Sequence, residues 1–286
     1  MTPKVSLIVI CYEMGRELPR TLASLAPQYQ GLEACDYEII VVDNNSREAP
    51  RQESFAHLHA GLKVFNCASP SPSPVRAINE GIARARGDLI GVWIDGARMA
   101  SPGLVRACIA ASALHPRPVV ATLNYQLGPE LQRFSSDKGY DQAAEDALLD
   151  SIGWPADGYR LFDIATPEIR GGPLGAMLES NALFLLRAMW DELGGYDERF
   201  AEPGGSVVNP DTLIRAVALP GAQLIRILGE GTFHQIHGGL STSALTKAMN
   251  MLKEGSKSYL RLRGKPLAPV RFAGWTYNSR TGELTR

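Results

Sequence analysis

Short runs of β-branched and apolar residues alternate with amphipathic stretches through the first hundred residues of the chain. Between the first two runs, Leu18, Leu22 and Leu25 recur at the spacing of one helix face. Because the apolar runs are continuous, they are typical of strands buried on both faces. The pattern predicts an α/β fold with a Rossmann-like, mostly parallel central sheet and helices on both faces. The runs that predict its first four strands are KVSLIVICYE, YEIIVVDNNS, LKVFNCAS and GDLIGVWID.

Strands and helices continue after residue 100, but less regularly. Residues 128–173 form a long polar excursion with one short predicted helix, which is typical of an insertion beside a binding site. A basic helix and tail follow at the C-terminal end. We expect a main domain over residues 1–242 and a separate helix and tail over residues 243–286.

Acidic residues follow three of the predicted strands: Glu13 the first, Asp43 the second and Asp95 the fourth. Sheets of this kind bind ligands beyond the carboxyl ends of their strands, so these side chains are candidates for a binding site. A free carboxylate at Asp43 suits a nucleobase imide or a ribose hydroxyl. The same residue, followed by Asn-Asn-Ser, is equally typical of a turn that caps the strand.

Two histidines follow a later predicted strand, in the segment GTFHQIHGG. On an extended strand His234 and His237 would point to opposite faces, so they can share a metal only if the chain turns there. The local sequence favours a structural, hydrogen-bonded role for His234 and leaves metal binding open for His237. We assign no role to the other three histidines, which are His57, His59 and His115.

Three further carboxylates are candidates for catalysis. Asp211 lies in the first turn of the helix predicted from NPDTLIRA, where the helix dipole stabilises a negative charge. Its spacing favours a stabilising role over that of a catalytic base. Glu202 lies in the glycine-containing loop FAEPGGS. Glu179 begins the apolar strand predicted from LESNALF, where an acid is costly unless it is paired or faces a cleft.

The formal net charge of −1 gives no global field that would favour nucleic acid or a membrane. Residues 247–286 depart from this average, with nine Lys or Arg against two Glu. A solvated surface helix and arm is the favoured interpretation. The alternatives are an anionic surface or acidic partner, packing on the core, a homodimer contact and a peripheral membrane contact. The membrane contact is least favoured because the segment lacks a strong apolar face.

Cysteines and the N-terminal segment bear on the cellular compartment. The cysteines show no metal-ligand spacing, so we expect single buried thiols, no disulfides and a reducing environment. The first apolar run is too short to span a membrane and has no signal-peptide cleavage pattern. A cytoplasmic protein is therefore expected. The four cysteines are Cys11, Cys35, Cys67 and Cys108.

Taken in order, these segments resemble the family 2 glycosyltransferases, nucleotide-sugar-dependent inverting enzymes with an A-type glycosyltransferase fold. The resemblance covers about residues 4–242. It implies a nucleotide-binding half of about residues 1–100 and an acceptor-side half of about residues 101–242. The segments that carry it are VSLIVICYEMGRELPRTLASL, YEIIVVDNNS, AINEGIARARGDLIGVWIDGARMASPG, LFLLRAMWDELGGYDERF with DTLIRA, and HGGLSTS.

The resemblance implies roles for residues of the first half. Asp43 matches the acid that contacts the base of the donor nucleotide. The loop of Cys11, Tyr12 and Glu13 matches the start of the nucleotide pocket. Asn79, in the third matching segment, is assigned to the donor site with them.

The diphosphate site departs from the family pattern. Asp95 matches the first acid of the Asp-x-Asp motif, and His237 matches a histidine near the donor phosphates that can bind a metal. The second acid, which normally holds Mg²⁺ or Mn²⁺ against the diphosphate, is Ala97 here, followed by Arg98. We expect either a metal held weakly by Asp95 and His237, or Arg98 supplying the positive charge in its place.

The base position departs as well. Counted back from Arg215, the family's acidic pair falls on Val208 and Asn209, which leaves Asp211 as the candidate base beside the two glutamates named above. The resemblance implies an inverting transferase that moves a sugar to a carbohydrate or other hydroxyl acceptor, with weak or absent metal dependence and no nucleic-acid partner. The alternative is a nucleotide-sugar-binding protein of the same fold that has lost turnover. A nucleotidyltransferase is disfavoured, because CYEMGREL is not a glycine-rich basic phosphate loop.

Overall fold

A computed structural model describes residues 2–168, 173–237, 245–271 and 274–286. Within them the strands form one mixed sheet in the order β11-β10-β9-β6-β8-β4-β1-β2-β3, with β5 paired to β9 and β7 paired to β6. The strands are β1 (Val5–Cys11), β2 (Tyr37–Asp43), β3 (Leu62–Asn66), β4 (Leu89–Trp93), β5 (Arg98–Ala100), β6 (Pro118–Leu127), β7 (Ala165–Pro167), β8 (Ala182–Leu186), β9 (Gln223–His234), β10 (Trp275–Asn278) and β11 (Leu284–Thr285).

Strand directions confirm the mostly parallel sheet. The N-terminal strands β4, β1, β2 and β3 are mutually parallel, and so are β6, β9 and β10. Between these two groups lies β8, which runs antiparallel to both β4 and β6. All four strands predicted in the first hundred residues are present, at the expected places.

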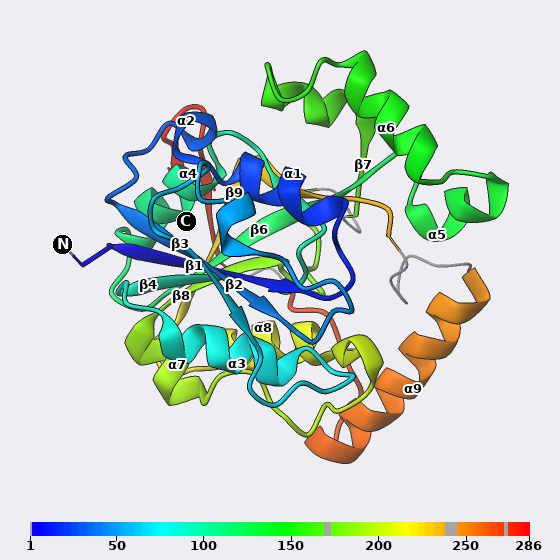
Figure 1. The fold of residues 1–286 in the computed structure, drawn as a ribbon. Helices are drawn as coiled ribbons and strands as arrows, with labels where there is room; N and C mark the ends of the chain where they lie inside the picture. The colour runs from blue at the N-terminus through cyan, green and yellow to red at the C-terminus, as the bar shows by residue number, and fades with distance from the viewer. Residues whose placement is uncertain (1, 169–172, 238–244, 272–273) are drawn as a thin grey trace.

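Helices cover both faces of the sheet (Figure 1), as the sequence predicts. β1 shows why a continuous apolar run is needed: Leu7 and Val9 belong to the core under α1 and α4, while Ile8 and Ile10 belong to the core under α3, α7 and α8. Successive strand residues point to opposite faces, so one strand supplies two cores. The α-helices are α1 (Glu17–Ser24), α2 (Pro27–Gln30), α3 (Val75–Arg84), α4 (Leu104–Ser112), α5 (Gln132–Ser135), α6 (Gln142–Ser151), α7 (Arg187–Leu193), α8 (Val208–Val217) and α9 (Leu245–Arg263).

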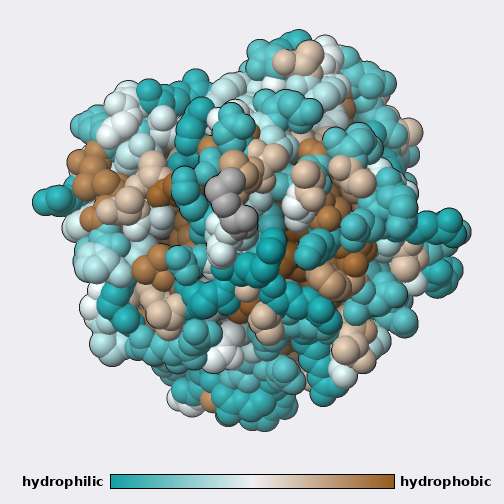
Figure 2. Space-filling view, turned by 60° about the vertical axis from the view of Figure 1, so that its left-hand side comes forward, coloured by the Kyte–Doolittle hydropathy of each residue, from teal (hydrophilic) through white to brown (hydrophobic). Residues whose placement is uncertain are grey.

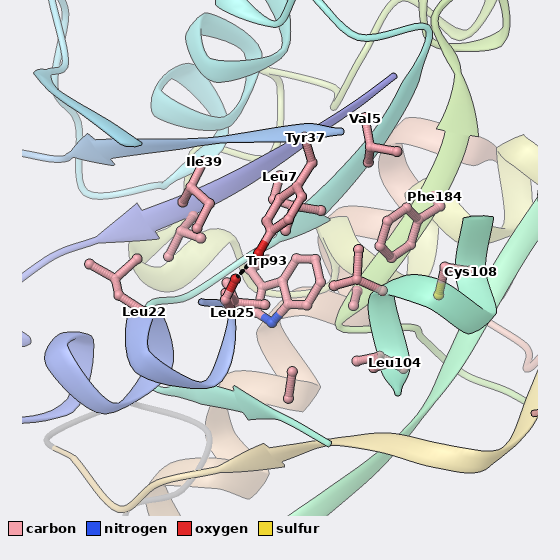
Figure 3. Packing of buried hydrophobic residues seen from close by; sticks show 14 of the residues in the cluster. Val5, Leu7, Leu22, Leu25, Tyr37, Ile39, Trp93, Leu104, Cys108 and Phe184 are labelled. Carbon is pink, nitrogen blue, oxygen red and sulfur yellow. Dashed lines mark hydrogen bonds between the residues drawn. The ribbon is translucent and has the colours of Figure 1, made fainter. Parts of the chain in front are cut away.

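The core under α1 and α4 packs around aromatic side chains (Figure 3). The rings of Trp93 and Phe184 meet edge to face, with centroids 5.7 Å apart. The Tyr37 hydroxyl donates a hydrogen bond of 2.6 Å to the carbonyl of Leu25, just after the end of α1. This bond satisfies the one polar atom of a buried ring and holds α1 in place over β2.

The predicted insertion over residues 128–173 contains α5, α6 and β7. It also contains two 3₁₀ helices, η2 (Ser136–Lys138) and η3 (Gly158–Ile164). It shares a small core with the sheet, in which Leu149 of α6 belongs to the same cluster as Phe233 of β9. Arg16, before α1, donates to Asp146 of α6 at 2.6 Å. The insertion is therefore packed against the main domain.

The C-terminal segment differs from the expected solvated arm. β10 pairs in parallel with β9, and β11 pairs with β10, so residues 275–285 extend the sheet. Tyr259 of α9 is buried in the second core. Only the outer side of α9 matches the expectation, with Met249, Leu252 and Leu260 exposed. The sequence alone did not predict these two edge strands, because each is shorter than five residues.

The face drawn in Figure 2 is mostly hydrophilic, with hydrophobic residues showing in small groups between polar ones.

Three of the four cysteines match the expectation of buried thiols. The buried free thiols are Cys11, Cys67 and Cys108, whereas Cys35 is exposed, contrary to the expectation for that residue. Among the described residues, no helix combines the length and the apolar character that crossing a bilayer requires.

Candidate functional site

The loops after β1 and β2 are joined at the carboxyl edge of the sheet. The strand register places Cys11 beside Asp43. The Glu13 amide donates to Ser46 Oγ at 2.8 Å, and the Arg47 amide donates to the Glu13 carboxylate at 2.8 Å. Residues more than thirty positions apart thus lie side by side here, where the sequence predicts the nucleotide pocket.

The side chains of this predicted pocket differ in what they offer a ligand. Tyr12 is 55% exposed. Burial raises the pKa of the Cys11 thiol to about 12, so this side chain stays neutral. The Asp43 carboxylate is buried and accepts from the amide and the hydroxyl of Ser46, at 2.9 and 2.6 Å. The turn that the sequence left open for Asp43 is therefore present, and its contact with a donor base stays a prediction.

Asp95 follows β4 and is held from both sides. Its Oδ1 accepts from the Ala97 amide at 3.0 Å, and its Oδ2 accepts from Arg98 Nε at 3.0 Å. Burial alone would raise the pKa of Asp95, but the Arg98 guanidinium, helped by the hydrogen bond from the Ala97 amide, outweighs it and lowers the pKa to about 2. The acid is therefore ionised at neutral pH and available to a cation.

The short strand β5 brings the two histidines to Asp95. Arg98 of β5 pairs with His234, the last residue of β9, and the chain leaves the strand there. The turn puts His237 Nε2 3.1 Å from His234 Nε2, while His234 Nε2 lies 3.8 Å from Asp95 Oδ2. The turn that a metal shared by these two histidines requires is therefore present, and metal binding stays a prediction. No sequence pattern indicated β5, because it has only three residues.

Gln132 sets the proton position on His234. Its amide nitrogen donates to the His234 carbonyl at 2.9 Å, so its Oε1, 2.7 Å from His234 Nδ1, is the acceptor of an Nδ1–H. Burial lowers the pKa of both His234 and His237, which keeps them neutral. His234 Nε2 therefore presents a lone pair toward His237 and Asp95.

These three side chains fit a divalent cation. Among the described residues, Asp95, His234 and His237 form a group whose ligand atoms all lie within 4.8 Å of one another. One carboxylate and two neutral imidazoles suit Mn²⁺ better than Mg²⁺, which prefers oxygen ligands. Arg98 adds a fixed charge at the same place, and its Nη1 is buried without a hydrogen-bond partner among the described residues. The site therefore combines a group that could hold a cation with the fixed positive charge of Arg98.

Ala97 stands where the resemblance expects the second acid of the Asp-x-Asp motif. The Ala97 side chain is fully buried and packs in the core under α1 and α4. A carboxylate on this backbone would enter an apolar core instead of facing the histidines, at a large desolvation cost. The Asp-x-Asp pattern cannot be restored here by one substitution without moving the chain.

Of the three acids predicted to be catalytic, Glu179 is the one whose pKa responds to the charge of Arg98. Its carboxylate accepts from Asn209 Nδ2 at 3.1 Å and from Asn181 Nδ2 at 3.4 Å. Burial, with the charge of Glu168, raises the pKa of Glu179, and Arg98 opposes that rise. A half-buried carboxylate with a raised pKa is a candidate for proton transfer.

Asp211 is held in a buried ion-pair network. It is fully buried, and its oxygens accept from Arg215 Nε at 2.8 Å and from Arg263 Nε and Nη2 at 2.6 and 2.7 Å. The predicted role as a base does not fit these contacts, because no side of the carboxylate is open to an acceptor. The stabilising role that its spacing favours does fit, since the network joins α8 to the end of α9.

Two further predictions meet contacts that point elsewhere. Glu202 accepts a hydrogen bond from Ser258 of α9, which ties its loop to that helix and argues against catalysis. Asn79 of α3 uses both ends of its amide on the backbone of Tyr196, at 2.9 Å each. Its amide therefore holds the turn after α7 and is not free for a donor.

Glu145 of α6 is a residue that the sequence analysis missed. It is fully buried, and its Oε2 accepts from the Ile236 amide at 2.6 Å, between the two histidines. Its Oε1 lies 3.3 Å from Arg16. Burial raises the pKa of Glu145 to about 7. The insertion thereby positions the loop that carries His237. This contact joins segments about ninety residues apart, so no local sequence pattern could have indicated it.

Comparisons with known proteins agree with this arrangement. The structure of S. aureus TarS 1-349 with UDP aligns with a TM-score of 0.58 and 12% identity, over 90% of this chain and 65% of that one. The complex of the same protein with UDP-GlcNAc gives 0.56 and 15%, over 90% and 66%. At these identities the likeness shows the fold, and this chain spans about two thirds of the length of TarS 1-349. No curated protein matches the chain at a significant level.

The sequence itself carries the family assignment. The model of glycosyl transferase family 2 matches residues 6–160, which include the loops after β1, β2 and β4. The sheet order and the alignment with TarS agree with an A-type glycosyltransferase fold. Because this match covers more than half of the chain and the fold agrees, the protein belongs to glycosyl transferase family 2.

Proposed function

We propose that this protein transfers a sugar from a nucleotide-diphosphate sugar to a hydroxyl acceptor, with inversion at the anomeric carbon. The observation that carries the proposal is the meeting of Asp95, Arg98, His234 and His237 at the carboxyl edge of a family 2 fold. The TarS structures hold UDP and UDP-GlcNAc, which supports testing uridine donors first. The acceptor is a carbohydrate or another hydroxyl compound.

Donor binding is assigned to the loops after β1 and β2. The exposed ring of Tyr12 offers a face on which a base can stack. Asp43 and the ion pair of Glu13 with Arg47 keep the two loops together. In this assignment the nucleoside binds on these two loops, and its diphosphate extends toward Asp95.

Asp95, His234 and His237 would hold Mn²⁺ or Mg²⁺, and three protein ligands imply weak binding without the diphosphate. When bound, such an ion neutralises charge on the diphosphate as it leaves. Arg98 contributes to the same end through its unpartnered Nη1, which can donate to a phosphate oxygen. The enzyme therefore depends on metal less than a relative with two motif acids.

Glu179 is assigned as the base. Its carboxylate takes the proton of the acceptor hydroxyl as that oxygen bonds to the anomeric carbon, and the bond from this carbon to the diphosphate breaks. Asn181 and Asn209 orient the carboxylate. The raised pKa of Glu179 places its titration closer to neutral pH than that of an ordinary glutamate.

A donor-turnover assay tests the assignment. Glu179→Gln should lower turnover at least a hundredfold while the dissociation constant for UDP stays within about threefold. Glu202→Gln is the matched control and should keep turnover. Excess chelator should reduce the rate partly, and Mn²⁺ should restore it. Full activity of Glu179→Gln would show that this residue is not the base. Full activity in chelator would show that no metal is needed, and it would leave the neutralisation of the diphosphate to Arg98.

One observation favours a second function, a nucleotide-sugar-binding protein without turnover. Asn209 stands where the family carries an acid, and the neighbouring Asp211 is ion-paired with Arg215 and Arg263. Calorimetry with UDP, GDP and dTDP sugars, followed by a release assay with acceptor extracts, separates the two. Tight binding without release in any extract would support the binding protein.

A further inference from the structure

A cavity of about 570 Å³ lies apart from the Asp95 site, between α4, η3 and the C-terminal strand β10. Its volume is in the range of small-molecule sites and exceeds what a single ion needs. Small side chains of α4 leave room on one side, and hydroxyl groups and guanidinium groups line the others. The lining residues are Gly103, Arg106, Ala107, Ala110, Tyr159, Glu230, Tyr277, Ser279 and Arg280.

The cavity forms where β9 changes its partner. Residues 225–228 of β9 pair with β10, and residues 232–234 pair with β5. Against β6, the register moves from Ala121 beside Arg226 to Leu123 beside Gly231, so three extra residues of β9 are accommodated there. Such a bulge redirects side chains out of the ladder. Here it places Glu230 in the cavity wall.

Glu230 organises this wall and has little capacity left for a ligand. Its carboxylate accepts from Ser101 Oγ, the Gly103 amide, Tyr159 Oη and Ser279 Oγ. These donors come from the start of α4, from the insertion and from the segment after β10. A Cβ atom on Gly103 would lie 2.4 Å from Glu230 Oε1, so glycine is required at this contact.

Two arginines line the same cavity and have no acidic partner among the described residues. Arg106 and Arg280 are exposed, and neither has a carboxylate within ion-pair distance among the residues that the structure describes. Arg280 lies over the Tyr159 ring, 5.0 Å from its centroid. The oxygens of Glu230 are taken by four neutral donors, so against its one negative charge the cavity lining carries two arginines without an ion pair.

We propose that this cavity binds an organic phosphate, a phosphate monoester on a small hydroxyl-bearing body. Guanidinium forks bind phosphate oxygens in pairs, which accounts for Arg106 and Arg280. The hydroxyl groups of Tyr277 and Ser279 can hydrogen-bond to the body, and Ala107 and Ala110 leave it space. Four residues of extended strand separate Glu230 from His234, about 13 Å, so the site is separate from the donor site.

Calorimetry on the full chain tests the proposal with ribose 5-phosphate, inorganic phosphate and ribose. Ribose 5-phosphate should bind more tightly than inorganic phosphate, and ribose should not bind. Arg106→Ala and Arg280→Ala should each weaken binding at least tenfold, and the Lys substitutions should fall between, because lysine keeps the charge without the fork. Both residues are exposed, so the variants should fold, as a urea midpoint can confirm.

Two control variants decide where the ligand binds. Arg51→Ala removes an exposed arginine between β2 and β3, at the opposite end of the sheet, and should leave the affinity unchanged. Arg98→Met alters the donor site and should also leave it unchanged. Unaltered affinity in the double variant of Arg106 and Arg280, loss of binding in Arg98→Met alone, or no preference for ribose 5-phosphate over inorganic phosphate would each overturn the proposal.

Discussion

Replacing Asp211 by asparagine tests whether this acid stabilises the fold or performs catalysis. Asparagine has the same shape, so the change removes the charge and one acceptor without creating a cavity. Asp211 is fully buried and accepts three hydrogen bonds, two from Arg263 and one from Arg215. In Asp211→Asn an amide N–H faces a guanidinium N–H, and both arginines lose their buried counter-charge.

The size of the effect follows from these contacts. Breaking a buried ion pair by removing one partner costs about 3 to 5 kcal/mol. Arg263 keeps a second partner in Asp197 at 2.7 Å, and Arg215 keeps two backbone carbonyls, so the lower end applies. We expect a loss of about 3 kcal/mol in the free energy of unfolding, equivalent to a fall in Tm of about 6 °C.

Urea unfolding and donor turnover are measured on the same samples. Asp191→Asn, an exposed aspartate of α7, is the matched control and should change stability by less than about 0.5 kcal/mol. A cycle with Arg263→Ala should show strong coupling to Asp211→Asn, because each removes the same ion pair. A stable Asp211→Asn protein that binds UDP normally but has lost turnover would refute this reasoning and restore Asp211 as the base.

Three further predictions concern the site and its support. Gln132→Ala removes the acceptor that keeps the proton of His234 on Nδ1. The variant should therefore bind Mn²⁺ about ten- to a hundredfold more weakly in calorimetry. Glu145 has a folded pKa of about 7 against an ordinary value of 4.5, so its contribution to stability is complete below pH 4.5 and is lost as the pH rises through 7. Unfolding of Glu145→Gln should lack this decline, and an unchanged pH profile would contradict the assignment. Tyr12→Ala should weaken UDP binding about tenfold by loss of stacking, and an unaltered dissociation constant would exclude the ring from the pocket.

The local pattern was enough for the sheet and for part of the site. Continuous apolar runs predicted four parallel strands, and the acids after them predicted the functional edge, because parallel strands end on one side of a sheet. Asp95 and Arg98 are close in sequence, so their ion pair lies within reach of local reasoning. The family match rests on the same segments.

What the sequence by itself determined is the α/β fold and the identity of the acids at its edge. Tertiary structure alone decided which partners each candidate acid has. Local sequence left both Asp211 and Glu179 as candidate catalytic acids, but Arg263, fifty-two residues away, pairs with the first, whereas burial raises the pKa of the second. His234 likewise meets Asp95 only because β5 pairs with β9. A side chain's charge and access depend on its spatial neighbours, and long-range pairing supplies those neighbours.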